Sequence, residues 1–121
     1  MAGRYERLRQ AIATLAASAD AQAAYLDRLH APLTGGGSAA EYSNDELALE
    51  FDDVFHAAGH MIDAGELTPW QRDAALPLDH ILKGLSGQMH ADFWKRDALW
   101  SDARWEEVRT VAKQALAAYT Q

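Results

Sequence analysis

Two histidines four residues apart, His56 and His60, are the pair whose spacing best suits a metal ion. Side chains at positions i and i+4 project from the same side of an α-helix, so both imidazoles could bind one ion. In the zinc-binding helix motif His-Glu-x-x-His, the second position is a general-base glutamate, and here it is Ala57. Three carboxylates within about one or two helical turns could add oxygen ligands: Asp52, Asp53 and Asp63.

The helix expected around these histidines turns them away from its apolar side. Residues 43–65 open with Ser-Asn-Asp-Glu, a capping box, and end at Gly65, a residue type favoured just after a helix. At about 100° per residue, the apolar side chains share one face and the two histidines lie on the opposite face. Bundle metal centres need ligands that point inward. The sequence therefore favours a solvated acidic face over a metal site, and no cofactor is predicted. The expected inner face consists of Leu47, Phe51, Val54, Phe55, Ala58, Met61 and Ile62.

No other pattern supports catalysis. Residues 84–88 read Gly-Leu-Ser-Gly-Gln, which misses the Gly-x-Ser-x-Gly elbow by one residue, and no strand pattern precedes them. Asp52 and Asp53 are adjacent, so their side chains diverge by about 100° on a helix and cannot form a facing acid/base pair. We therefore predict no catalytic residues.

The negative charge is concentrated in the middle of the chain. The net charge is −7, and residues 31–66 hold eight carboxylates with no Lys or Arg. An acidic surface repels phosphate backbones and anionic membranes, which argues against nucleic-acid and membrane partners. It suits a protein partner with a basic surface. The carboxylates predicted to meet that partner are Glu46, Glu50, Asp52, Asp53 and Asp63.

Two tryptophans are candidate anchors for such a partner. Trp is enriched at binding hot spots, and it also fills the cores of small alanine-rich bundles. Trp105 shares helical phase with apolar residues, which predicts a core position. Trp94 and Trp100 lie in less regular sequence, where either a core or an interface position is open.

Composition indicates one ordinary globular domain. The chain has 121 residues, 49% of them hydrophobic and 24% charged. It has no cysteine, which fits a reducing compartment. No apolar run reaches the about 20 residues that a membrane span needs, and the apolar core of a signal peptide is missing near the start. We expect a single cytoplasmic domain over residues 1–121.

The first helical segment is expected over residues 4–30 as one long helix. Pro32 and the triple glycine that follows predict a flexible connector over residues 31–42. The helix carries a heptad-like seam that two copies of the chain could share as a homodimer interface. The seam consists of Tyr5, Leu8, Ile12, Leu15, Ala19, Gln22, Leu26 and Leu29.

Two further helices are expected after the acidic one. Thr68 is a predicted N-cap, with Pro69 in the first turn and Gln71 completing a capping box. The apolar stripe of this helix keeps its phase across Pro77, which predicts one kinked helix whose end is marked by Gly84 and Gly87. The stripe consists of Trp70, Ala74, Leu78, Ile81, Leu82 and Leu85.

The last helix is expected to begin at Ser101 or Asp102, after an irregular stretch over residues 88–101 with one helical turn near Asp97. No strand pattern competes, so the fold class is all-α, as a compact four-helix bundle-like domain. The buried face of the last helix is predicted to hold Trp105, Val108, Ala112, Ala115, Leu116 and Tyr119.

These features favour a small, acidic, non-catalytic protein that binds a basic protein partner, as immunity proteins and antitoxins do. Carboxylates placed over a cationic cleft would speed association. Two alternatives remain open: a metal-dependent helical-bundle enzyme that uses His56 and His60, and a self-assembling structural module.

Overall fold

A computed structural model describes residues 3–34 and 44–119, and among these residues every regular element is a helix. The all-α prediction is confirmed. In chain order the helices are α1 (Arg4–Ala16), α2 (Ala19–Thr34), α3 (Asp45–Phe55), α4 (Ala58–Asp63), α5 (Pro69–Gly84), the 3₁₀ helix η2 (Gln88–Trp94), α6 (Ala98–Ser101) and α7 (Ala103–Leu116).

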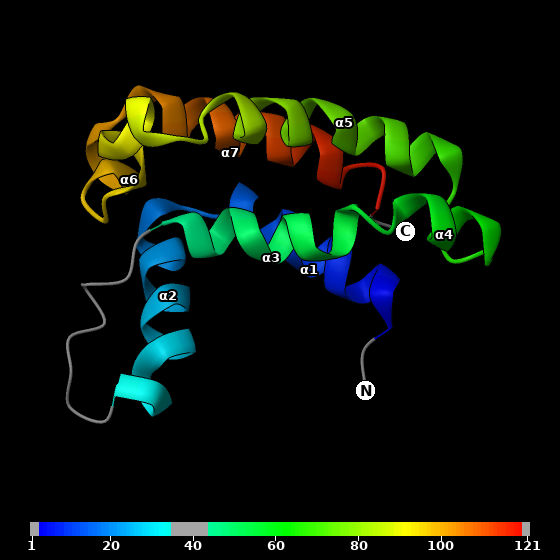
Figure 1. The fold of residues 1–121 in the computed structure, drawn as a ribbon, viewed down its shortest axis with the longest axis horizontal. Coiled ribbons are helices and arrows are strands. Elements are labelled where there is room, and N and C mark those ends of the chain that lie inside the picture. The colour runs from blue at the N-terminus through cyan, green and yellow to red at the C-terminus, as the bar shows by residue number, and fades with distance from the viewer. Residues whose placement is uncertain (1–2, 35–43, 120–121) are drawn as a thin grey trace.

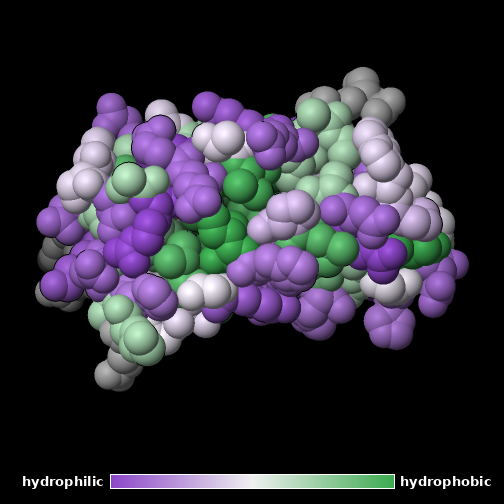
Figure 2. Space-filling model, turned by 90° about the horizontal axis from the view of Figure 1, so that it is seen from above, coloured by the Kyte–Doolittle hydropathy of each residue, from purple (hydrophilic) through white to green (hydrophobic). Residues whose placement is uncertain are grey.

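The long helices lie in two layers (Figure 1). α5 and α7 pack together in one layer, α1 and α3 pack together in the other, and α1 also packs against α7. α2 leaves these layers at a steep angle. On the face formed by α5 and α7, apolar side chains gather along the middle with hydrophilic ones on both sides (Figure 2). The arrangement is compatible with the predicted bundle.

The stretch predicted as one long helix over residues 4–30 is two helices, so that prediction is wrong. The chain is extended at Ala17, and the Ser18 hydroxyl accepts a hydrogen bond from the backbone N–H of Ala21 at 3.2 Å. Gln22 is fully buried and donates from its side-chain amide to two carbonyl oxygens in the last turn of α1, both at 3.1 Å. These bonds satisfy groups that a helix end leaves without partners, which makes the break stable.

α2 continues past Pro32 to Thr34, so the predicted connector begins too early. The fixed φ of proline is close to the helical value, so a helix can pass through proline at the cost of one backbone hydrogen bond and of crowding against the carbonyl four residues earlier. The remaining connector, residues 35–42, and Ser43 of the predicted capping box lie outside the described residues.

The acidic segment is also two helices, α3 and α4, rather than the one predicted. The break lies at Ala57, whose N–H donates to the Val54 carbonyl at 3.0 Å, a tighter turn than the α-helical one. Gly59, a poor helix former, follows in the first turn of α4. The predicted ending is confirmed: Gly65 has φ +76°, and the N–H of the next residue donates to the Met61 carbonyl at 2.8 Å.

The predicted rotation of this segment is confirmed. All the apolar residues expected on its inner face are buried except Ile62, which is half-buried. His56 and His60 are both exposed.

The cap of α5 is confirmed in both directions. The Thr68 hydroxyl accepts from the N–H of Gln71, and the Gln71 side chain accepts from the N–H of Thr68, each at 3.1 Å. α5 runs through Pro77 as one helix.

The predicted stripe of α5 is confirmed only in part. Leu78 and Leu82 are buried, and three further residues are half-buried: Ala74, Ile81 and Leu85. Trp70 is 63% exposed rather than inside. Gln71 is buried in its place because its amide donates to the Ala118 carbonyl at 3.1 Å and its own carbonyl accepts from the Tyr119 hydroxyl at 2.8 Å. Bonds to the end of the chain therefore hold Gln71, rather than Trp70, in the interior.

Replacing Thr68 with alanine should lower the free energy of unfolding by about 1 kcal/mol, because one orphan N–H of α5 loses its acceptor. Urea denaturation followed by circular dichroism would measure this change. Thr110→Ala is the matched control, since Thr110 is exposed within α7 and caps no helix, and it should be nearly neutral. Equal changes in the two variants would contradict the cap's role.

Aromatic residues fill the end of the core near η2. Trp105 is fully buried, its ring stacks on Phe93 with centroids 4.4 Å apart, and its indole N–H donates to the Phe93 carbonyl at 2.8 Å. The predicted inner face of α7 is confirmed, with Leu116 half-buried.

One charged side chain on that face was not predicted. The side chain of Arg109 is only 7% exposed, and it donates to Gln22 Oε1 at 3.1 Å and to the Leu99 carbonyl at 2.5 Å. It therefore joins α7 to α2 and α6. Arg109 also pairs with Glu106 at 2.9 Å, one turn earlier on α7.

Candidate functional site

A groove of about 530 Å³ lies between α3 and α5. It forms where these two helices face each other while each packs mainly on another helix, α3 on α1 and α5 on α7. The lining mixes apolar side chains with carboxylates and one lysine. It consists of Asp45, Ala48, Leu49, Phe51, Asp52, Asp79, Leu82, Lys83, Ser86, Gly87, Ala91 and Trp94.

α3 supplies one wall through residues spaced by three and four. Asp45, Ala48, Leu49 and Asp52 share the side of the helix next to its buried face. Leu49 is 47% exposed, a high value for leucine in the middle of a helix. This wall therefore presents apolar surface between two carboxylates.

α5 supplies the opposite wall, which contains an ion pair between a buried carboxylate and an exposed lysine. The side chain of Asp79 is 10% exposed, and its carboxylate lies 3.1 Å from the ammonium of Lys83 one turn later. The side chain of Lys83 is 67% exposed. A buried carboxylate needs a partner, and here that partner is a lysine that can move into water.

Trp94 closes one end of the groove. Its indole N–H donates to the Leu85 carbonyl at 2.8 Å, and its ring meets Phe93 and Trp105 edge-on. The N–H of Asn44 donates to the Trp94 carbonyl at 2.9 Å, and the Asn44 side chain donates to the Lys95 carbonyl. Trp94 is thus half-buried and fixed in place, with one side toward the groove.

Trp100, the other predicted anchor, does not line the groove. It is 54% exposed, and its indole N–H donates to the carboxylate of Asp20 on α2 at 2.7 Å. The structure therefore separates the two tryptophans.

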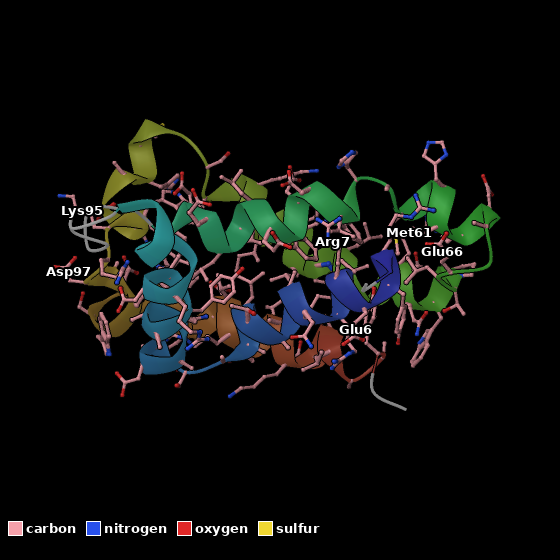
Figure 3. All side chains as sticks on the ribbon, turned by 90° about the horizontal axis from the view of Figure 1, so that it is seen from below. Glu6, Arg7, Met61, Glu66, Lys95 and Asp97 are labelled. Atoms are coloured by element: carbon pink, nitrogen blue, oxygen red, sulfur yellow. The ribbon has the colours of Figure 1, made fainter. Side chains whose placement is uncertain are left out.

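The predicted acidic residues are spread around α3 instead of forming one surface. Asp52 lines the groove. Glu50 lies on the other side, 3.9 Å from Arg7 of α1, whose position is labelled in Figure 3. Burial, then the nearby carboxylates of Glu50 and Glu46, raise the pKa of the Tyr25 phenol on α2. Glu46 and Glu50 thus lie toward α1 and α2.

Asp63 lies in a second hollow, of about 500 Å³, around α4 and the start of α5. His56, His60 and Arg72 line the same hollow. The ring Nδ1 of His56 lies 3.1 Å from the Asp52 carbonyl oxygen. Within residues 3–34 and 44–119, no three His, Cys, Asp or Glu side chains are grouped as metal ligands. The positive charge of the Arg72 guanidinium would repel a metal cation bound in this hollow.

The groove residues that the sequence did not reveal are Asp79, Lys83 and Leu49. Asp79 and Lys83 are four residues apart, which is a recognisable signal for a helical ion pair. The burial of Asp79 depends on how the helices around α5 are arranged, which no local pattern specifies.

The chain matches no family model, no curated protein and no solved structure. Among the helices that the structure describes, none has the length and apolar character needed to cross a membrane.

Proposed function

We propose that this chain is a non-catalytic, cytoplasmic binding protein whose acidic α3 recognises a basic surface on a protein partner. An inhibitor of the immunity or antitoxin type is the form of activity that this chemistry suits best. The observation that carries the proposal is the excess of negative charge on α3, where Asp52 and Asp53 are exposed.

α3 holds five carboxylates and no lysine or arginine within its eleven residues. Of the ion pairs formed within the described residues, none involves Glu46, Asp52 or Asp53. Like charges on one short helix repel one another, and a basic partner would relieve that repulsion. Charge of this kind mainly raises the association rate and selects against wrong partners.

The hypothesis of a homodimer through the first helix has less support than the proposal of a basic protein partner. Leu8, Ile12 and Leu15 of the first-helix seam are fully buried within the chain, where α1 packs on α3 and α7. Pairing two copies through those residues would require the monomer to open. The hypothesis of a metal-dependent enzyme rests on His56 and His60, which are exposed and share their hollow with Arg72. No observation favours this hypothesis over a binding function.

The proposal is tested by capturing the partner from the source organism and measuring association rates at several salt concentrations. Asp52→Asn/Asp53→Asn should slow association with that partner by about tenfold at low salt, because long-range attraction is lost. The difference from the unmodified protein should shrink as salt screens the charges.

The matched control is Asp73→Asn/Glu107→Gln, which removes the same charge from exposed positions on α5 and α7. Its association rate should stay within about twofold of the unmodified value. A rate that is indifferent both to salt and to the α3 substitutions would contradict the proposal.

A further inference from the structure

We propose that the groove between α3 and α5 binds an amphipathic, basic helix of the partner, one of whose arginines replaces Lys83 beside Asp79. This inference rests on the proposed function and adds the place and chemistry of recognition. It commits to one occupant, a cationic helical segment.

The apolar part of the groove fits the apolar face of a helix. Leu49 projects from α3, Leu82 lies on the α5 wall, and Trp94 forms the end. Helices bind in such grooves through apolar side chains at positions i, i+3, i+4 and i+7. A rigid tryptophan at the end of a groove is a frequent anchor point.

The charges of the groove select a basic occupant. Asp52 lies exposed on one wall, and the Asp79 carboxylate lies on the other beside the ammonium of Lys83. An acidic segment would bring like charges together and be repelled. A second copy of this chain is disfavoured for the same reason, since each copy carries a net charge of −7.

The Asp79–Lys83 pair is the feature that a partner can exchange. Asp79 is fixed and buried, whereas two-thirds of the Lys83 side chain is exposed and its ammonium can turn into water. An incoming guanidinium could bind the carboxylate through two parallel hydrogen bonds, which a lysine cannot do. The released Lys83 ammonium would be solvated at the rim. Asp79 would then lie at the centre of the interface, where hot spots concentrate.

The experiment measures binding of labelled helical peptides, each about four turns long, to the full chain by fluorescence anisotropy. One peptide has leucines on one face and arginines at the flanks, a second has lysines in place of the arginines, and a third has glutamates. We expect the leucine–arginine peptide to bind most tightly and the leucine–glutamate peptide not to bind. Equal binding of the arginine and glutamate peptides would overturn the inference.

Two groove variants locate the site. Leu49→Asp, at an exposed position, and Asp79→Asn should each weaken binding of the leucine–arginine peptide by about tenfold or more. Asp53→Asn, which lies outside the groove lining, should change it by less than about threefold. Circular dichroism checks that each variant is folded. Binding that is unchanged in Leu49→Asp would overturn the inference, whatever happens to Asp79→Asn.

A double-mutant cycle tests the exchange itself. Lys83→Ala should tighten peptide binding more than Lys113→Ala, which removes the same charge from an exposed position on α7. In the Asp79→Asn background this extra gain should disappear. Equal effects of Lys83→Ala and Lys113→Ala would show general attraction only and overturn the exchange.

The outcomes also separate this inference from the proposed function. If the natural partner's association depends on Asp52, Asp53 and salt but not on Leu49 or Asp79, then the proposed function stands and the groove is wrong. A dimer in sedimentation that Leu49→Asp dissociates would assign the groove to a second copy and overturn the inference. Salt-independent binding of the natural partner would instead contradict the proposed function.

Discussion

Replacing Arg109 with alanine is expected to lower the free energy of unfolding by about 2–4 kcal/mol. The arginine is buried and donates to the side-chain oxygen of Gln22 and to the Leu99 carbonyl. Without the arginine, these two acceptors stay buried away from water with no hydrogen-bond donor, which costs their full desolvation penalty. Gln22 in turn caps the end of α1, so the substitution also loosens the α1–α2 corner.

Urea denaturation monitored by circular dichroism measures this loss, with the m-value checked for two-state behaviour. Glu106→Gln is the matched control, because it removes only the 79% exposed partner of Arg109. That change should cost less than about 1 kcal/mol. An Arg109→Ala variant no less stable than Glu106→Gln would show that the buried bonds contribute little.

Replacing Trp105 with alanine is expected to cost about 3–5 kcal/mol, the range found for large aromatic side chains removed from a core. Trp105 is fully buried, and its ring contacts both Phe93 and Trp94. The cavity left behind would also remove the support of η2, whose end forms one limit of the groove. Peptide binding in the groove should therefore weaken in any Trp105 variant that still folds.

Trp100→Ala is the natural comparison, since it removes the same side chain from a 54% exposed position. We expect it to cost less than about 1 kcal/mol, because only an exposed bond to Asp20 is lost. Thermal unfolding of the two variants side by side would measure the difference. Similar losses for both would contradict the assignment of Trp105 to the core and Trp100 to the surface.

Local signals in the sequence predicted the parts of the fold that depend on neighbouring residues. Thr68 and Gln71 cap α5 because both partners of the capping box lie within one turn. Gly65 ends the acidic segment because a positive φ suits glycine. The inward face of α3 and α4 was predictable because helical periodicity is regular enough to survive the break at Ala57.

The sequence failed where distant groups decide the outcome. The first helix breaks at Ala17 and Ser18 with the help of Gln22, whose amide reaches back to α1 and is held by Arg109 on α7. The Ser18 bond is local, but no window of neighbouring residues shows that Arg109 holds the buried Gln22 side chain. The predicted burial of Trp70 was wrong for a related reason, since bonds to Ala118 and Tyr119 hold Gln71 in the interior instead.

The candidate site was only half predictable. The carboxylates of α3 were expected to be exposed, and Asp52 and Asp53 are. The groove beside them depends on how α1 and α7 hold α3 and α5, so Asp79 could not be recognised from its own helix.

The hydrogen bonds from Asn44 to the backbone of Trp94 and Lys95 tie the start of α3 to the end of the groove that Trp94 forms. At that end the walls are already positioned before any ligand arrives. The conformational entropy lost on binding then falls mainly on the ligand. Segments that are already helical in solution would be favoured over those that must fold on contact, so this protein would select for ligand rigidity as well as for ligand charge.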